Sequence, residues 1–184
     1  MSARLVFATS NAHKVEELEA ILAPAWEGFE AGCVARMSDF DVDSPVEDGV
    51  SFEENSLIKA RALARATGLA AIADDSGITV DVLGGAPGIF SARWAGSHGD
   101  DAANLRLLLE QLSDVPDRHR GAAFVSAAVL VTPDGREFVQ RGEVRGTLTR
   151  SPRGEGGFGY DPIFVPDGCE VTTAQMSPAE KNAI

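Results

Sequence analysis

The spacing of apolar residues changes along this chain between the period of a strand and the period of a helix. Residues 4–8 are almost all apolar, which predicts a short buried strand, and apolar residues then recur three and four apart, which predicts a helix. The same patterns predict helices around 15–22, at 51–67, at 101–112 and from Pro178 onward. They predict strands at 4–8, 69–73, 78–83, 122–131, 137–144 and 163–165.

Turn-forming residues separate these segments. Ser51 and Gly68 are typical of the start and end of a helix, and Pro133-Asp134-Gly135 between two predicted strands is a hairpin signal. Interleaved strands and helices, with a hairpin in the second half, predict an α/β fold in which helices flank a central mixed sheet. The length of 184 residues fits a single domain spanning 1–184.

The charge and composition narrow the classes of partner. A net charge of −12 argues against nucleic acid and against an anionic membrane, because both would repel this surface. The amino terminus lacks the apolar stretch of a signal peptide, and the two cysteines have neither metal-ligand nor disulfide-framework spacing. We therefore expect a cytoplasmic protein, in which any anionic substrate needs a local positive pocket.

The first segment that could carry chemistry is the turn between the first strand and the first helix. It runs from Thr9 to Lys14 and reads Thr-Ser-Asn-Ala-His-Lys. A helix N-terminus offers free N–H groups and a positive dipole end, which suit a phosphate, and Lys14 could reach the same anion. The alternative is that Ser10 or Asn11 only caps the helix.

A second candidate is the acidic pair Asp74 and Asp75, which follows the predicted strand at 69–73. Ligands commonly bind at the carboxyl ends of strands in α/β sheets. Adjacent carboxylates raise one another's pKa unless a cation lies between them, and a Mg²⁺ ion carried by a triphosphate would satisfy both. The alternative is an Asx turn in which Gly77 supplies a positive φ.

The second predicted helix and the loop before it hold several charged and polar residues. Ser51 and Glu54 fit a capping box, which gives Glu54 a structural explanation. Asn55 and Lys59 lie four residues apart and therefore share one helix face. Such a pair is more often a solvent-facing surface than a site, and the same holds for Glu47 in the acidic loop.

The glycine-rich segment from Gly154 to Asp161 reads Gly-Glu-Gly-Gly-Phe-Gly-Tyr-Asp. Glycines let a ligand approach the backbone, and a planar base could stack on Phe158 or Tyr160. The alternative is that both aromatic side chains are anchored in the core. The three histidines fit neither a catalytic triad nor a metal site.

Taken in order, these segments resemble those of the non-canonical purine NTP pyrophosphatase family, also called the inosine triphosphatase family, over essentially the whole chain. The segment 9–14 is similar to the family's T-x-N-x-x-K turn, and 52–60 is similar to its F-x-E-N-x-x-x-K-A helix. The other matching segments are 73–77, 83–93, 157–162 and 180–181. All three lysines of the chain fall inside these motifs, which favours a functional role for them over a genomic bias toward arginine.

The resemblance implies a Mg²⁺-dependent hydrolase that converts ITP, dITP and XTP to the monophosphate and pyrophosphate and so cleanses the nucleotide pool. It also implies a homodimer of elongated α/β units, each with a nucleotide cleft between two lobes. The implied catalytic residues are Asp75 as proton acceptor, Lys14, Glu54 and Lys59. The implied substrate-binding residues are Thr9, Ser10, Asn11, Ala12, His13, Lys14, Ser76, Phe158, Gly159, Tyr160, Asp161 and Lys181. The implied metal ligands are Asp75, Asp74 and Glu47.

The sequence departs from the family pattern in two places. Many relatives carry a second acidic metal ligand where an ungapped alignment puts Val46, with Glu47 one place on. The family also continues after its Lys181 segment with Ser-His-Arg and a final helix that help to hold the base, whereas the sequence given ends at Ile184. We expect that helix to be missing or to lie beyond this sequence.

Three other functions fit parts of the pattern. A Maf-type nucleotide pyrophosphatase shares the fold and reaction but prefers other bases, and the helix at 52–60 and the segment 157–162 argue against it. A nucleotide-binding protein without turnover would bind ITP but release no pyrophosphate. A phosphomonoesterase would release orthophosphate instead.

Overall fold

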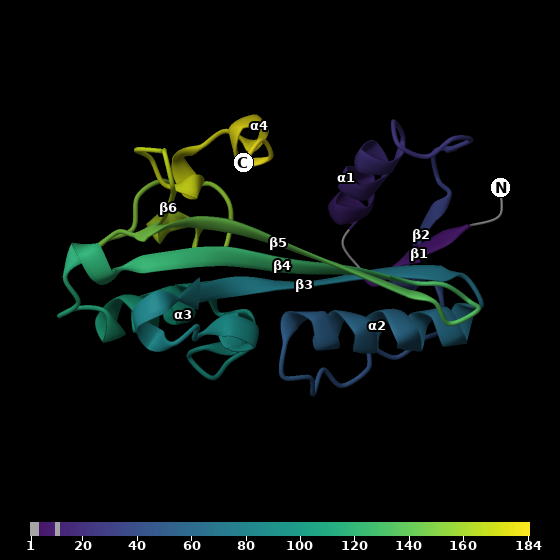
Figure 1. The fold of residues 1–184 in the computed structure, drawn as a ribbon, viewed down its shortest axis with the longest axis horizontal. Coiled ribbons are helices and arrows are strands. Elements are labelled where there is room, and N and C mark those ends of the chain that lie inside the picture. Colours follow the sequence, from purple (N-terminus) through teal and green to yellow (C-terminus); the bar gives the residue numbers. More distant parts are fainter. Residues whose placement is uncertain (1–3, 10–11) are drawn as a thin grey trace. The chain divides into compact units, whose positions relative to one another are not determined.

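The computed structural model describes residues 4–9 and 12–184, without the side chains of residues 12–14 and 17. The described residues form an α/β fold with a six-stranded sheet in the order β2-β1-β3-β4-β5-β6 (Figure 1). The strands are β1 (Leu5–Phe7), β2 (Val34–Arg36), β3 (Ala70–Val80), β4 (Gly121–Val131), β5 (Glu137–Leu148) and β6 (Phe164–Pro166). The helices are α1 (Ala12–Leu22), α2 (Phe52–Thr67), α3 (Asp101–Gln111) and α4 (Pro178–Lys181). β1 runs parallel to β2 and β3 while β5 runs antiparallel to β6, so the predicted mixed sheet is confirmed.

The predicted limits of α2 are also confirmed. Ser51 caps the helix by accepting the Glu54 N–H at 3.1 Å. Gly68 ends it with φ 69° and donates its N–H to the Ala64 carbonyl. Because these contacts lie within one turn of each end, the local sequence was sufficient to predict them.

The predictions for the middle of the chain need correction. The expected strands at 69–73 and 78–83 are a single strand, β3, and the Asx-turn alternative is wrong because Gly77 lies inside that strand without a positive φ. The buried positions change phase along β3, from Ala71 and Ala73 to Ile78 and Val80. Asp74 and Asp75 lie where the phase changes. In the sequence, two polar residues between two apolar segments look the same as a polar turn between two strands.

The strand β2 was not predicted, because its residues Val34, Ala35 and Arg36 form neither an apolar run bounded by turns nor a clear alternation. It pairs in parallel with β1, from Leu5 opposite Val34 to Phe7 opposite Arg36. The long-range pairing, rather than any alternation in the sequence, therefore creates this strand.

The chain divides into two compact units. The first holds the residues up to Asp75 together with Ala127–Arg141, and the second holds Ser76–Ser126 together with Gly142–Ile184. In the first unit two apolar clusters are present. One joins α2, through Leu63 and its neighbours, to Val6 and other strand residues, and the other joins α1, through Val15, to Leu5 and its neighbours. Both sheet faces are covered, which explains the continuous apolar run in β1.

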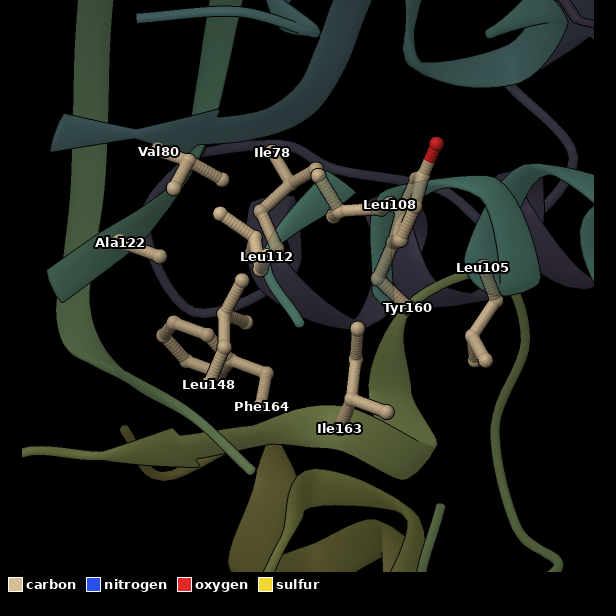
Figure 2. Packing of buried hydrophobic residues seen from close by; sticks show 10 residues of the cluster. All are labelled: Ile78, Val80, Leu105, Leu108, Leu112, Ala122, Leu148, Tyr160, Ile163 and Phe164. Atoms are coloured by element: carbon tan, nitrogen blue, oxygen red, sulfur yellow. The ribbon is translucent and has the colours of Figure 1, made fainter. Parts of the chain in front are cut away.

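The second unit has its own core, built on α3 and shown in Figure 2. Leu105, Leu108 and Leu112 recur on one face of α3, as the helical spacing predicted. They pack with residues of four strands, of the glycine-rich segment and of the short turn that follows it: Ile78, Val80, Ala122, Leu148, Tyr160, Ile163 and Phe164. α3 thereby anchors the segment in which nucleotide-binding residues were expected.

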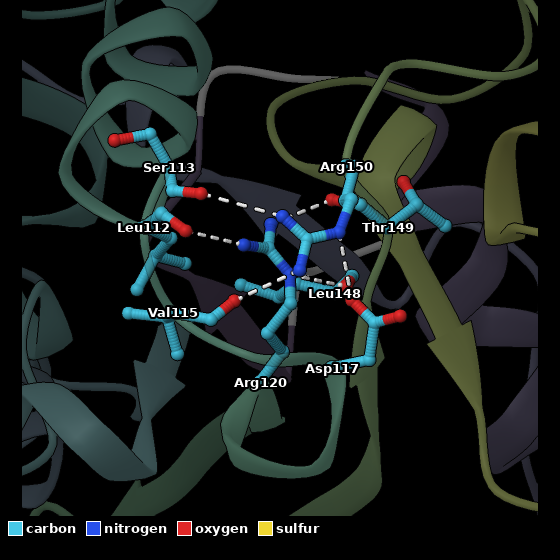
Figure 3. A network of polar contacts seen from close by, with 8 residues as sticks. All are labelled: Leu112, Ser113, Val115, Asp117, Arg120, Leu148, Thr149 and Arg150. Carbon is cyan, nitrogen blue, oxygen red and sulfur yellow. Dashed lines mark hydrogen bonds and ion pairs between the residues drawn. The ribbon is translucent and has the colours of Figure 1, made fainter.

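A buried arginine ties the end of α3 to the end of β5 (Figure 3). The Arg120 guanidinium is 1% exposed and donates to the backbone carbonyls of Leu112 at 2.7 Å, Leu148 at 2.9 Å and Thr149 at 2.8 Å. Burial lowers the pKa of Arg120. Beside it, Arg150 donates to the Asp117 carboxylate at 2.8 Å. These contacts fix the backbone from which the segment 154–161 departs.

None of the helices among the described residues combines the length and apolar character needed to cross a membrane.

Candidate functional site

The first candidate segment lies between a strand and a helix, as predicted. β1 ends at Phe7 and α1 begins at Ala12, and the Thr9 carbonyl accepts the Met37 N–H at 3.2 Å. Ser10 and Asn11 lie outside the described residues. The side chains of Ala12, His13 and Lys14, which are expected to bind substrate, also lie outside what the structure describes. Phosphate binding by this turn therefore stays a prediction.

The start of α2 holds the loop before it. In addition to the Ser51 cap, the Glu54 carboxylate accepts the Val50 N–H at 2.7 Å, one residue earlier than in a standard capping box. Glu54 is exposed. Its carboxylate therefore takes part in shaping the loop that leads into α2.

One turn further along, Asn55 joins that loop to β3. The side chain is 2% exposed, so the solvent-facing alternative is wrong for this residue. Its Nδ2 donates to Oδ2 of Asp75 at 3.2 Å, and its Oδ1 accepts the Gly49 N–H at 3.0 Å. The buried amide thus contacts one carboxylate of the predicted acidic pair.

Lys59 lies on the same face of α2 and reaches the same loop. Its Nζ is 3.1 Å from Oε2 of Glu47, and the two side chains are 17% and 38% exposed. Glu47 is solvent-facing, as the sequence suggested, while Lys59 is largely covered. The ion pair places a predicted catalytic lysine beside a predicted metal ligand.

The acidic pair of β3 offers carboxylate oxygens, which are the ligands that a hard divalent cation prefers. Asp74 and Asp75 are both half-buried, and Ser76 is exposed. Among the residues that the structure describes, no three His, Cys, Asp or Glu side chains gather into a group that could hold a metal ion. Mg²⁺ commonly binds through one or two carboxylates plus substrate phosphates and water, which is an arrangement that Asp75 and Glu47 fit by their donor atoms.

In the second unit, the glycine-rich segment separates its two aromatic residues. Tyr160 is 5% exposed, belongs to the core, and donates its hydroxyl to the Ser91 carbonyl at 2.9 Å. Burial, and to a smaller extent the Asp101 carboxylate, raise the pKa of the Tyr160 hydroxyl far above its ordinary value. Phe158 is 75% exposed. The core-anchored alternative therefore holds for Tyr160, and Phe158 is the ring that a base could stack on.

Asp161 is the centre of the polar contacts around this segment. It is 2% exposed, and its carboxylate accepts the Phe158 N–H at 2.8 Å and the Thr173 hydroxyl at 2.8 Å. Lys181 lies 2.5 Å from the same carboxylate and 5.1 Å from the centre of the Phe158 ring. A Cβ atom at Gly157, which has φ 73°, would overlap the Asp161 carboxylate. The glycine is therefore required for this close approach.

The sequence matches a known family over nearly its whole length. Residues 5–184 match the Ham1 family. The chain belongs to that family. A dITP/XTP pyrophosphatase of Streptomyces avermitilis is 59% identical over 181 residues, covering 98% of this chain and 90% of the relative. A dITP/XTP pyrophosphatase of Mycobacterium tuberculosis is 54% identical over 182 residues, covering 98% and 88%.

Solved structures of Ham1 proteins share the fold. A dITP/XTP pyrophosphatase from Mycobacterium abscessus superposes with a TM-score of 0.85 at 51% identity, over 97% of this chain and 91% of the other. A HAM1 protein from Coxiella burnetii gives a TM-score of 0.90 at 38% identity, over 100% and 91%. The family resemblance and the α/β fold expected from the sequence are both confirmed.

Within this Ham1 protein, three polar residues around the candidate site carry contacts that the sequence did not reveal. The sequence favours a solvent-facing position for Asn55 and gives no sign of a role for Thr173. Asp101, at the start of α3, accepts the Gly159 N–H at 2.8 Å and so holds the glycine-rich segment. Each of these contacts joins residues that are at least 12 positions apart. No local sequence motif could therefore have predicted these contacts, because only the fold brings the partners together.

Proposed function

We propose that this chain hydrolyses ITP, dITP and XTP to the corresponding monophosphate and pyrophosphate, acting on the cytoplasmic nucleotide pool. The observation that carries the proposal is the 59% identity to a dITP/XTP pyrophosphatase over 98% of the chain. The contacts around Asp75 and Asp161 support it, because one set offers a carboxylate for water activation and the other offers an aromatic ring and an ammonium for a base.

In this mechanism Asp75 acts as the general base. Its carboxylate accepts a proton from a water molecule whose oxygen bonds to the α-phosphorus, while the bond from that phosphorus to the bridging oxygen breaks and pyrophosphate leaves. Asn55 donates to one oxygen of Asp75 and so directs the carboxylate that would orient the water.

Charge on the phosphates would be neutralised by Lys14, Lys59 and the N-terminus of α1. Lys59 lies beside Glu47, so it is directed toward the loop. Mg²⁺, held by Asp75 and Glu47 together with phosphate oxygens, would supply further charge neutralisation. We propose Asp75 and Glu47 as its protein ligands.

The purine would stack on Phe158, with Lys181 close to the base or sugar. A site built to hydrogen-bond the 6-oxo group of hypoxanthine or xanthine rejects adenine, because the amino group of adenine leaves those donors unpaired. Guanine also has a 6-oxo group, so its exclusion must depend on its 2-amino group. This selection concerns the base alone, so both ribose and deoxyribose forms should be substrates.

We propose further that the protein acts as a homodimer, as the family resemblance implies. Phe138 and Val139 of β5 are 53% and 46% exposed. Consecutive strand residues project to opposite faces of a sheet, so each of these apolar side chains is exposed on its own face and could be buried against a second copy. Light scattering coupled to gel filtration tests this, and a mass of one chain at micromolar concentration would refute it.

The function itself is tested by pyrophosphate release from ITP, XTP, dITP, GTP and ATP, each with Mg²⁺ and with a chelator. We expect rapid release from the first three substrates only, and none with the chelator. Release of orthophosphate from ITP would indicate a phosphomonoesterase, and binding of ITP without any release would indicate a protein that only binds nucleotides.

A further inference from the structure

The geometry points to Asn55 as a positioning residue that fixes Asp75 and the 45–50 loop with one side chain. The inference rests on the proposed function, in which Asp75 activates water and Glu47 lies on that loop. Asn55 contacts neither the water nor the phosphates in this proposal. It acts through Asp75 on one side and through the loop backbone on the other.

The first argument is the chemistry of the amide. Asn55 donates to a carboxylate and accepts from a backbone N–H at the same time, over 3.2 Å to Asp75 and 3.0 Å to Gly49. An aspartate of the same shape could accept from Gly49 but would set a second carboxylate against Asp75. Only a side chain with both a donor and an acceptor satisfies both neighbours.

The second argument is burial. Asn55 is 2% exposed, and a buried polar side chain is costly unless its hydrogen bonds are made. A buried amide in contact with two partners also has few alternative rotamers. It therefore holds the Asp75 carboxylate in one direction, which a water molecule in the same place would not do.

The third argument is the approach of the loop. A Cβ atom at Gly49 would lie 2.7 Å from Oδ1 of Asn55 and 2.8 Å from Cβ of Glu54. The loop can accept the Asn55 contact only because residue 49 has no side chain. Together with Glu54 on Val50 and Lys59 on Glu47, the contact ties the loop to α2 at three points.

The test compares Asn55→Ala with Ser56→Ala. Ser56 is the next residue of α2, is fully buried, and donates to the Ala127 carbonyl at 2.9 Å, so its loss removes a buried hydrogen bond without touching Asp75. We expect Asn55→Ala to lower kcat for ITP about tenfold or more and to change KM by less than about threefold. Ser56→Ala should keep kcat within about twofold of wild type.

A second variant disturbs the same hydrogen bond by changing its partner in the loop, Gly49. Gly49→Ala places a methyl group against Oδ1 of Asn55 and leaves Asn55 itself unchanged. We expect kcat to fall severalfold in this variant also. Gly49→Ala decides the question if Asn55→Ala does not fold, as judged by thermal unfolding.

Amide hydrogen exchange gives a readout that does not depend on turnover. The Gly49 N–H should exchange about tenfold faster or more in Asn55→Ala than in wild type, and at the wild-type rate in Ser56→Ala. If the wild-type protein releases no pyrophosphate, the proposed function fails. If it is active and a folded Asn55→Ala or Gly49→Ala protein keeps wild-type kcat, or if Gly49 exchange does not change in Asn55→Ala, the positioning role fails by itself.

Discussion

The ammonium of Lys181 lies 2.5 Å from the buried carboxylate of Asp161. The same carboxylate accepts the backbone N–H of Phe158, whose ring lies under the ammonium at 5.1 Å. Asp161 therefore sets the positions of both groups that we expect to contact the base. Its own contact with a ligand is not needed for this effect, because it acts through its two neighbours.

We predict that Asp161→Asn raises KM for ITP about tenfold or more and lowers kcat less. The amide cannot hold Lys181 by charge, and it turns one acceptor of the Phe158 N–H or the Thr173 hydroxyl into a donor. Steady-state kinetics with ITP measure both constants. Asp114→Asn, an exposed aspartate of the same unit, is the control and should behave as wild type.

The two aromatic residues of the segment should separate binding from stability. Phe158→Ala removes an exposed ring, so we expect a raised KM for ITP and an unfolding free energy within about 0.5 kcal/mol of wild type. Tyr160→Phe removes the hydrogen bond to the Ser91 carbonyl, so we expect a loss of about 1 kcal/mol of stability and an unchanged KM. Urea unfolding and ITP kinetics on both variants check this. The reverse pattern would contradict the assignment of Phe158 to the base.

Replacing the proposed general base should stop the reaction without changing the fold. We predict that Asp75→Asn lowers kcat at least about a hundredfold, since it removes the proton acceptor and a charge that Mg²⁺ would bind. Thermal unfolding should remain cooperative. The exposed Asp48→Asn is the matched control and should retain activity. A kcat near the wild-type value in Asp75→Asn would disprove the mechanism.

The buried guanidinium of Arg120 should be replaceable by no other cation. We predict that Arg120→Lys lowers the free energy of unfolding by about 2 kcal/mol or more, because one ammonium cannot reach the carbonyls of Leu112, Leu148 and Thr149 together. The exposed Arg118→Lys should be neutral. Urea unfolding of the pair provides the measurement, and equal stabilities would show that the carbonyl contacts contribute nothing.

The sequence by itself determined those features that depend on neighbours within a few residues. The limits of α2 were predictable because Ser51 and Gly68 act within one turn of the helix ends. The apolar face of α3 was predictable because it repeats at the helical period. The hairpin was predictable because Gly135 lies between two apolar segments.

Only the tertiary structure decided what depends on distant partners. The acidic pair, expected in a turn, lies inside β3, because a strand continues wherever neighbouring strands satisfy its backbone. The position of Asn55 on α2 did not tell whether its side chain faces solvent or the interior. It is buried because Asp75 and Gly49, from other parts of the chain, pack against it. Phe158 and Tyr160, which are equivalent in the sequence pattern, separate into an exposed ring and a core ring. Propensities and caps act over one or two turns, whereas burial depends on contacts between residues that folding alone brings together.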